Sequence, residues 1–303
     1  MASKDRTTGT PDTPDTPDTP DTPDTPDTGA PRTTVGTVLA LWRFPVKSML
    51  GEKLDFVEVT RRGILGDRAY ALIDTATGKA VSAKNVKQFP QMLECRVRFI
   101  GEPSWQTDIR TETPPVEIAL PNGTFVRSDD PKADAVLSRF FGRDVHLAAA
   151  SPEQSAGSSL LVESGLSPQP VQGAFVDCAP ISLLTTSTLR HLNQLQPKSR
   201  FDERRFRMNA IVDTTSSGFV ENQWVGRTFE TSGGVRLQVV LADPRCVMTT
   251  LPQQDLPRDS DILRTLAKHN RMTVAGGKYP CAGVYAIVES SGILRTGDTV
   301  RLL

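Results

Sequence analysis

The sequence has no long apolar run, few aromatic residues and no block of like charge. None of its 303 residues belongs to an uninterrupted apolar segment of about 18 residues, the length that a helix needs to cross a bilayer. We therefore expect no membrane span. Aromatic residues make up 6% of the chain, and its 35 basic and 35 acidic side chains cancel. Nucleic-acid-binding segments carry clustered positive charge, so we expect no nucleic-acid partner.

Motifs for metal and phosphate binding are also missing. The widely spaced cysteines form no Cys-x-x-Cys pair, which fits neither a structural zinc site nor a plant-type iron–sulfur module. The three histidines are dispersed, and no P-loop, dinucleotide-binding glycine motif, nucleophile elbow or HExxH helix occurs. The chain shows no secretory or transit signal. We therefore expect reduced thiols and a cytoplasmic location.

The chain begins with a repeat, because residues 11–28 are six copies of Pro-Asp-Thr. Proline at every third position removes backbone donors and fixes φ, and the aspartates repel one another. We therefore expect residues 1–34 to form a disordered, extended leader. Residues 1–32 hold seven acidic and three basic side chains, which leaves 28 acidic and 32 basic side chains in residues 33–303. The zero net charge thus conceals a folded part with a small positive surplus.

The rest of the sequence predicts an α+β fold that is rich in strands. Apolar runs and alternating patterns predict strands in both halves, at residues 38–42, 67–74, 95–99, 116–120, 124–127, 181–184, 206–213, 235–242, 284–288 and 293–295. Asn122-Gly123 predicts a hairpin turn, and the last two strands are expected to form a second hairpin across Ser291-Gly292.

Three helices are expected between these strands. Start and stop signals place them at residues 132–141, from caps at 185–188 to about residue 195, and at residues 261–269. The segment 148–172 is rich in Ser, Pro, Gly and Gln. It predicts a boundary between a domain of residues 35–150 and a domain of residues 151–303.

Cys246 has the most suggestive surroundings of the four cysteines. It follows a predicted buried strand and Pro244, and the guanidinium of Arg245 beside it favours the thiolate. A thiolate can ligate a soft metal or act as a nucleophile, and nearby arginines favour an anionic partner. The residues alone leave open whether Cys246 is functional or simply a buried cysteine.

Several motifs, in order, resemble those of one protein family. Two match the MOSC N-terminal β-barrel domain: Phe44-Pro45-Val46-Lys47-Ser48 and Gly63-Ile64-Leu65-Gly66-Asp67-Arg68-Ala69-Tyr70. Three resemble the MOSC domain: Phe206-Arg207-Met208-Asn209, Arg245-Cys246 with Thr249-Thr250, and Gly283-Val284-Tyr285 with Gly297-Asp298. The resemblance covers residues 36–303. It implies an N-terminal β-barrel-like domain packed on a MOSC β-barrel domain with few helices.

The resemblance also implies a cofactor and its ligands. Members similar to the mitochondrial amidoxime-reducing components and their bacterial relatives bind the molybdenum cofactor, Mo-molybdopterin. By this resemblance Cys246 is the metal ligand, and it is catalytic together with Asp177, a candidate proton donor. The positions matching cofactor-contacting segments, or near them, are Lys47, Ser48, Arg68, Arg207, Asn209 and Arg245.

The implied activity is reduction of N-hydroxylated or N-oxide compounds, with no need for pyridoxal phosphate. Since the chain ends at Leu303 without the fused iron–sulfur domain of many bacterial relatives, a separate ferredoxin-, flavodoxin- or cytochrome-type protein is expected to supply electrons. The alternative is a carrier that holds sulfur as a persulfide, or the cofactor, without turnover. Two departures bear on substrate preference: Met208 replaces a frequent proline, and residues 251–255, expected at the substrate opening, replace the family's Asp-Pro loop.

Overall fold

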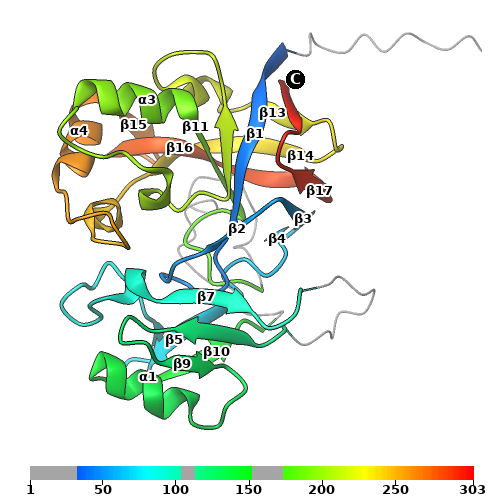
Figure 1. The fold of residues 1–303 in the computed structure, drawn as a ribbon. Helices are drawn as coiled ribbons and strands as arrows, with labels where there is room; N and C mark the ends of the chain where they lie inside the picture. Colours follow the sequence, from blue (N-terminus) through cyan, green and yellow to red (C-terminus); the bar gives the residue numbers. More distant parts are fainter. Residues whose placement is uncertain (1–32, 104–112, 152–172) are drawn as a thin grey trace, which may run out of the picture. The chain divides into compact units, whose positions relative to one another are not determined.

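The largest sheet of the computed structural model, which describes residues 33–103, 113–151 and 173–303, closes into a barrel. It closes because β11 pairs with β12 at one end of the strand order and with β16 at the other. In pairing order the seven strands of the barrel (Figure 1) are β11 (Ile181–Thr185), β12 (Ala210–Asp213), β1 (Thr33–Arg43), β18 (Thr299–Leu302), β13 (Thr228–Thr231), β14 (Arg236–Pro244) and β16 (Gly277–Ser290).

The barrel interior is filled by the apolar residues that alternate along these strands. Leu237 and Val239 of β14 are fully buried, and they share one core with Phe229, Val284 and Val300. A fully buried side chain of this size stabilises the fold by about 1.5–3 kcal/mol. Apolar segments such as residues 181–184 and 235–242 predicted strands in this half, and the strand-rich α+β fold is confirmed.

The first half of the chain adds three small sheets and one helix. The sheets are β10 (Val145–Ala149) with β5 (Tyr70–Asp74) and β6 (Lys79–Ala80), β7 (Arg96–Phe99) with β8 (Val116–Ala119) and β9 (Phe125–Arg127), and β3 (Phe56–Thr60) with β4 (Gly63–Ile64) and β17 (Gly292–Arg295). A short strand, β2 (Glu52–Leu54), pairs with β1. The predicted hairpin is confirmed, with Gly123 at φ +84° between β8 and β9.

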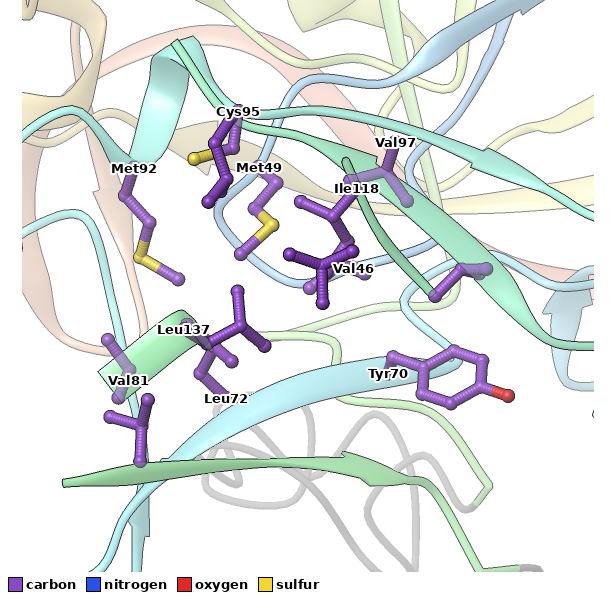
Figure 2. Close-up of a cluster of buried hydrophobic side chains, with 14 of the residues drawn as sticks. Val46, Met49, Tyr70, Leu72, Val81, Met92, Cys95, Val97, Ile118 and Leu137 are labelled. Carbon is purple, nitrogen blue, oxygen red and sulfur yellow. The ribbon is translucent and has the colours of Figure 1, made fainter. Parts of the chain in front are cut away.

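Figure 2 shows the core of this half, where Cys95 lies near Met49 and Met92. Burial raises the pKa of the Cys95 thiol to about 12. This cysteine is therefore a protonated, apolar core residue. Leu251 of the second half joins the same core, so the two halves share buried apolar surface.

The helices in the described part of the chain begin and end close to the predicted residues. They are α1 (Ala133–Phe141), α3 (Thr186–Leu195) and α4 (Asp261–His269). Helix α1 ends at Gly142 with φ +64°, and the Thr185 hydroxyl caps α3 by accepting a hydrogen bond from the Thr188 amide over 3.1 Å. Short 3-10 turns lie at Met92–Glu94, Glu203–Arg205, Val220–Trp224 and Val247–Thr250. Within the described ranges, no helix combines the length and apolarity needed to span a bilayer.

The expected C-terminal hairpin is wrong. β16 pairs with β14 along one edge and, within residues 277–286, with β15 (Arg271–Val274) and β11 along the other, and no pairing joins it to β17 among the described residues. Strand β17 instead pairs with β3, far away in the sequence.

Two expected strands, residues 67–74 and 206–213, are shorter than predicted. Arg68 and Arg207 have φ values of +50° and +55°, which extended strands do not allow. β5 and β12 therefore begin only at Tyr70 and Ala210. The predicted leader lies outside the described residues, except for Thr33 and Thr34, which open β1. Residues 152–172 of the expected domain boundary also lie outside them, so the boundary stays a prediction.

Candidate active site

Several chain segments meet around a cavity of about 230 Å³. They include the turn after β1, the turn before β5, the segment leading into β11, the turn before β12 and the end of β14. The cavity is lined by every residue that the sequence nominated for a site: Lys47, Ser48, Arg68, Asp177, Arg207, Asn209, Arg245 and Cys246. Folding thus brings these residues together from both halves of the chain, while their chemical roles stay predictions.

The thiol of Cys246 enters the cavity from the end of β14. The ladder with β16 stops there, with Pro244 opposite Cys281 and the Arg245 amide donating to the Pro280 carbonyl over 2.8 Å. Cys246 then starts a single 3-10 turn, and the Thr249 hydroxyl donates to the Cys246 carbonyl over 3.0 Å. The threonine of the motif therefore fixes the backbone that presents the cysteine.

A buried carboxylate, Asp67, links the two halves behind the cavity. It accepts hydrogen bonds from the Phe44 amide over 2.8 Å and from the Asn209 side chain over 3.1 Å, and it forms an ion pair with Arg68. The side-chain oxygen of Asn209, Oδ1, also accepts a hydrogen bond from the Ser182 hydroxyl over 3.1 Å. Asn209 therefore lines the cavity, but its amide is used to hold neighbouring segments in place.

Arg68 and Arg207 lie against the same aromatic ring. Their guanidinium carbons are 4.6 Å and 4.3 Å from the centroid of Phe44, a distance typical of cation–π contacts. Arg207 also donates to the Met49 carbonyl. Burial, reinforced by the charge of Arg68, lowers the pKa of Arg207 below its ordinary value. Two like charges held this close favour an anion between or beside them.

Asp177 lies between two lysines at the cavity. It forms an ion pair with Lys47 and accepts from the Lys84 ammonium over 3.2 Å. Partial desolvation opposes the shift, but the charges of Lys47 and Lys84 hold the pKa of Asp177 well below its usual range. Burial lowers the pKa of Lys47, with Asp177 as the largest opposing influence.

A second carboxylate, Asp243, forms an ion pair with Arg245 in the cavity wall. Asp243 is 1% exposed, and burial raises its pKa to about 6 against the opposing charge of Arg245. Arg245 also donates to the Phe206 carbonyl. One oxygen of Asp243 and the Nε of Arg245 are buried without a hydrogen-bond partner among the described residues.

Sequence reasoning missed several ionisable residues of this wall, among them Lys84, Arg205, Asp243 and Tyr285. Tyr285 belongs to the motif Gly283-Val284-Tyr285, and Asp243 lies two residues before Arg245-Cys246, so closeness to the motifs was a usable signal for both. Lys84 follows β6 and belongs to no motif. Its place opposite Asp177 follows from the fold alone.

The loop expected at the substrate opening does not line this cavity. Gln253 and Gln254 line a smaller cavity of about 20 Å³, which shares Arg207 with the larger one. Met208, the other departure from the family pattern, is 1% exposed, and its sulfur lies 3.8 Å from the guanidinium of Arg245.

The composition of the wall fits an anionic cofactor that carries its own metal ligands. Six basic and two acidic side chains line the cavity, namely Lys47, Arg68, Lys84, Arg205, Arg207 and Arg245 against Asp177 and Asp243. No group of three or more His, Cys, Asp or Glu residues suited to a metal occurs in the parts of the chain described. A metal bound to Cys246 would therefore need further ligands from the cofactor, and the dithiolene sulfurs of a molybdopterin match a soft thiolate.

Comparison with known proteins identifies two domains in the chain. Residues 35–141 match the MOSC N-terminal beta barrel domain, and residues 170–301 match the MOSC domain. The chain is therefore a MOSC domain protein. It is 28% identical over 298 residues to mitochondrial amidoxime reducing component 2 of Bos taurus, across 88% of this chain and 83% of that protein. It is 25% identical over 291 residues to mitochondrial amidoxime-reducing component 1 of Homo sapiens, across 89% and 83%.

Proposed function

We propose that this protein binds the molybdenum cofactor and reduces N-hydroxylated or N-oxide compounds, with electrons from a separate redox protein. The observation that carries the proposal is the single cavity in which the Cys246 thiol meets a surplus of basic side chains. The family and the names of the relatives support the same function. The bound cofactor would supply the two-electron redox chemistry.

The residues of this chain would hold the cofactor and orient it. Cys246 would ligate the metal from the end of β14, while Arg68, Arg207 and Lys47 would bind the anionic groups of the pterin phosphate. Arginine offers a planar fork that matches phosphate and ring edges, whereas lysine acts as a point charge. Because Phe44 supports both guanidinium groups, their positions are set before any ligand arrives.

Asp177 is better suited to neutralising lysines than to donating a proton. A carboxylate held between two ammonium groups stays ionised near neutral pH. It would keep Lys47 charged despite its burial, and thereby keep this lysine attractive to phosphate.

The test is to purify the protein and to measure molybdenum, pterin and the reduction of benzamidoxime by a dithionite-reduced dye. Cys246→Ala is expected to lose molybdenum and activity. Cys95→Ala, which removes a thiol from the core outside the cavity, is expected to retain both. Wild-type protein purified without metal, or a Cys246→Ala variant with unchanged activity, would contradict the proposal.

The carrier alternative predicts a different result in the same experiment. A persulfide on Cys246, detected by mass spectrometry on protein that holds no molybdenum, would favour a sulfur carrier without turnover. The cytoplasmic location and the type of electron donor are part of the proposal, and cell fractionation and reconstitution with candidate donor proteins test them.

A further inference from the structure

Two carboxylates line the cavity, and their surroundings differ. Asp177 is half exposed and faces two ammonium groups, Lys47 and Lys84. Asp243 is buried, its Oδ2 accepts a hydrogen bond from the guanidinium of Arg245, and its Oδ1 is buried without a well-formed hydrogen bond among the described residues. A buried carboxylate with an unpartnered oxygen is costly to ionise. The two carboxylates therefore take up protons in different pH ranges, Asp243 at higher pH than Asp177.

Tyr285 lies beside Asp243 in the cavity wall. It belongs to β16, where it faces Leu241 of β14 and Ser182 of β11 in the ladders, and its hydroxyl interacts with the Asp243 carboxylate. Burial, followed by the charge of Asp243, raises the pKa of Tyr285 well above its ordinary value. The phenol therefore stays neutral and can act as a hydrogen-bond donor.

The charged and titratable groups around Asp243 do not cancel the effect of burial on its pKa. The titratable or charged groups that influence Asp243 or its pair with Tyr285 are Arg245, Tyr285, Arg68, Cys178, Cys281 and Asp177. Burial raises the pKa of both Cys178 and Cys281 to about 12, so these thiols carry no charge that would compete. The buried cation in contact with Asp243 is Arg245, and burial outweighs its effect.

We propose that Asp243, held in place by Tyr285, is the proton-holding residue of this cavity and delivers a proton to the substrate during reduction. This inference rests on the proposed function. Reduction of an N-hydroxylated substrate breaks the N–O bond and releases water, and it consumes two electrons from the external donor protein and two protons. One proton moves from the Asp243 carboxyl to the departing oxygen, and the other comes from solvent. Solvent then returns a proton to Asp243.

The first test is the titration of Asp243 in the full-length, cofactor-free protein, followed by carbon-13 NMR of the side-chain carboxyl and assigned with Asp243→Asn. The midpoint is expected near pH 6. A midpoint below pH 5 would overturn the inference. In Tyr285→Phe the midpoint should move to higher pH, because the lost hydroxyl no longer stabilises the ionised form. If Tyr285 only supported the fold, the midpoint of Asp243 would be unchanged in Tyr285→Phe.

The second test is the pH dependence of kcat for benzamidoxime reduction by the loaded enzyme. Wild-type kcat is expected to fall as the pH rises through the Asp243 titration, and Asp243→Asn should lower kcat at least tenfold at pH 6 and abolish this inflection. Asp144→Asn, the same change at an exposed carboxylate outside the cavity, should keep both kcat and the inflection. An Asp243→Asn enzyme with the wild-type inflection would overturn the inference.

The two proposals fail in distinguishable ways. If the purified protein holds no metal and has no reductase activity, the proposed function is wrong, regardless of the pKa of Asp243. If the enzyme is active but Asp243 titrates below pH 5, or if Asp243→Asn leaves the pH profile unchanged, the proposed function stands. Only the proton-holding role of Asp243 is then wrong.

Discussion

Arg68 donates a hydrogen bond from Nη2 to the backbone carbonyl of Arg207 over 3.2 Å, across a sequence separation of 139 residues. Both residues have a positive φ, so each leaves the extended conformation and turns its side chain toward the cavity. Both guanidinium groups then lie against the ring of Phe44. One arginine from each half of the chain is thus held against the same ring in the wall of the cavity.

This shared ring predicts that Phe44→Leu affects both stability and ligand binding. The change keeps an apolar side chain but removes the aromatic face, and we expect the free energy of unfolding to fall by about 2 kcal/mol. Bound molybdenum and pterin should fall as well. Phe141→Leu, in the core of the first half, should cost similar stability without loss of cofactor. Urea denaturation and metal analysis measure the two effects, and full cofactor content in Phe44→Leu would contradict the role of the ring.

Gly283 is predicted to be intolerant of any side chain. Its φ is +81°, and an added Cβ would lie 2.0 Å from the Met208 Cε and 2.5 Å from the Leu183 carbonyl oxygen. The methionine tip can move aside, whereas the backbone carbonyl cannot, so Gly283→Ala should destabilise the protein by about 3 kcal/mol or more. Gly276 has a similar φ of +78° but open space around it, so Gly276→Ala should cost only about 1 kcal/mol. Equal losses in thermal unfolding would show that the close contact with the Leu183 carbonyl is unimportant.

Asp177 predicts a pH-dependent stability. Its carboxylate has a folded pKa lowered by Lys47 and Lys84, although partial desolvation opposes the shift. The resulting stabilisation is fully present above the unfolded pKa of about 4 and is lost as the pH falls through the folded pKa. Asp177→Asn should therefore melt below wild type at pH 7, and the gap should shrink toward pH 3. Asp144→Asn, an exposed control, should show no gap, and a pH-independent gap for Asp177→Asn would refute this account.

Glu221, which does not line the cavity, is predicted to be important for stability. This fully buried carboxylate accepts hydrogen bonds from the Thr185 and Thr188 hydroxyls, each over 2.7 Å, and from the Gly283 amide over 3.2 Å. In Glu221→Gln an NH2 group, which can only donate, replaces one carboxylate oxygen. At least one of these hydroxyl or amide donors then loses its acceptor. We expect the free energy of unfolding to fall by about 2–4 kcal/mol, as measured by urea denaturation. A loss below about 0.5 kcal/mol, the usual range for surface changes, would show that these bonds are dispensable.

Short-range features of the fold were predictable from the sequence. The hairpin at Asn122-Gly123 and the end of α1 at Gly142 follow from backbone preferences of a few adjacent residues, and the structure confirms them. The motifs also nominated eight residues that the fold brings to one cavity. The partner of β17 and the extent of β5 and β12 were not predictable in this way. Strand pairing depends on which edges are free, and a positive φ at Arg68 or Arg207 depends on contacts made after folding.

The sequence by itself determined the order of motifs, the cysteine beside an arginine and the small positive surplus of residues 33–303. Only the tertiary structure decided where that charge gathers and which carboxylate is disfavoured in its ionised form. Asp177 and Asp243 are the same residue type, and local sequence does not separate them. Through-space neighbours do, because two lysines stabilise the ionised form of Asp177 while burial disfavours the ionised form of Asp243.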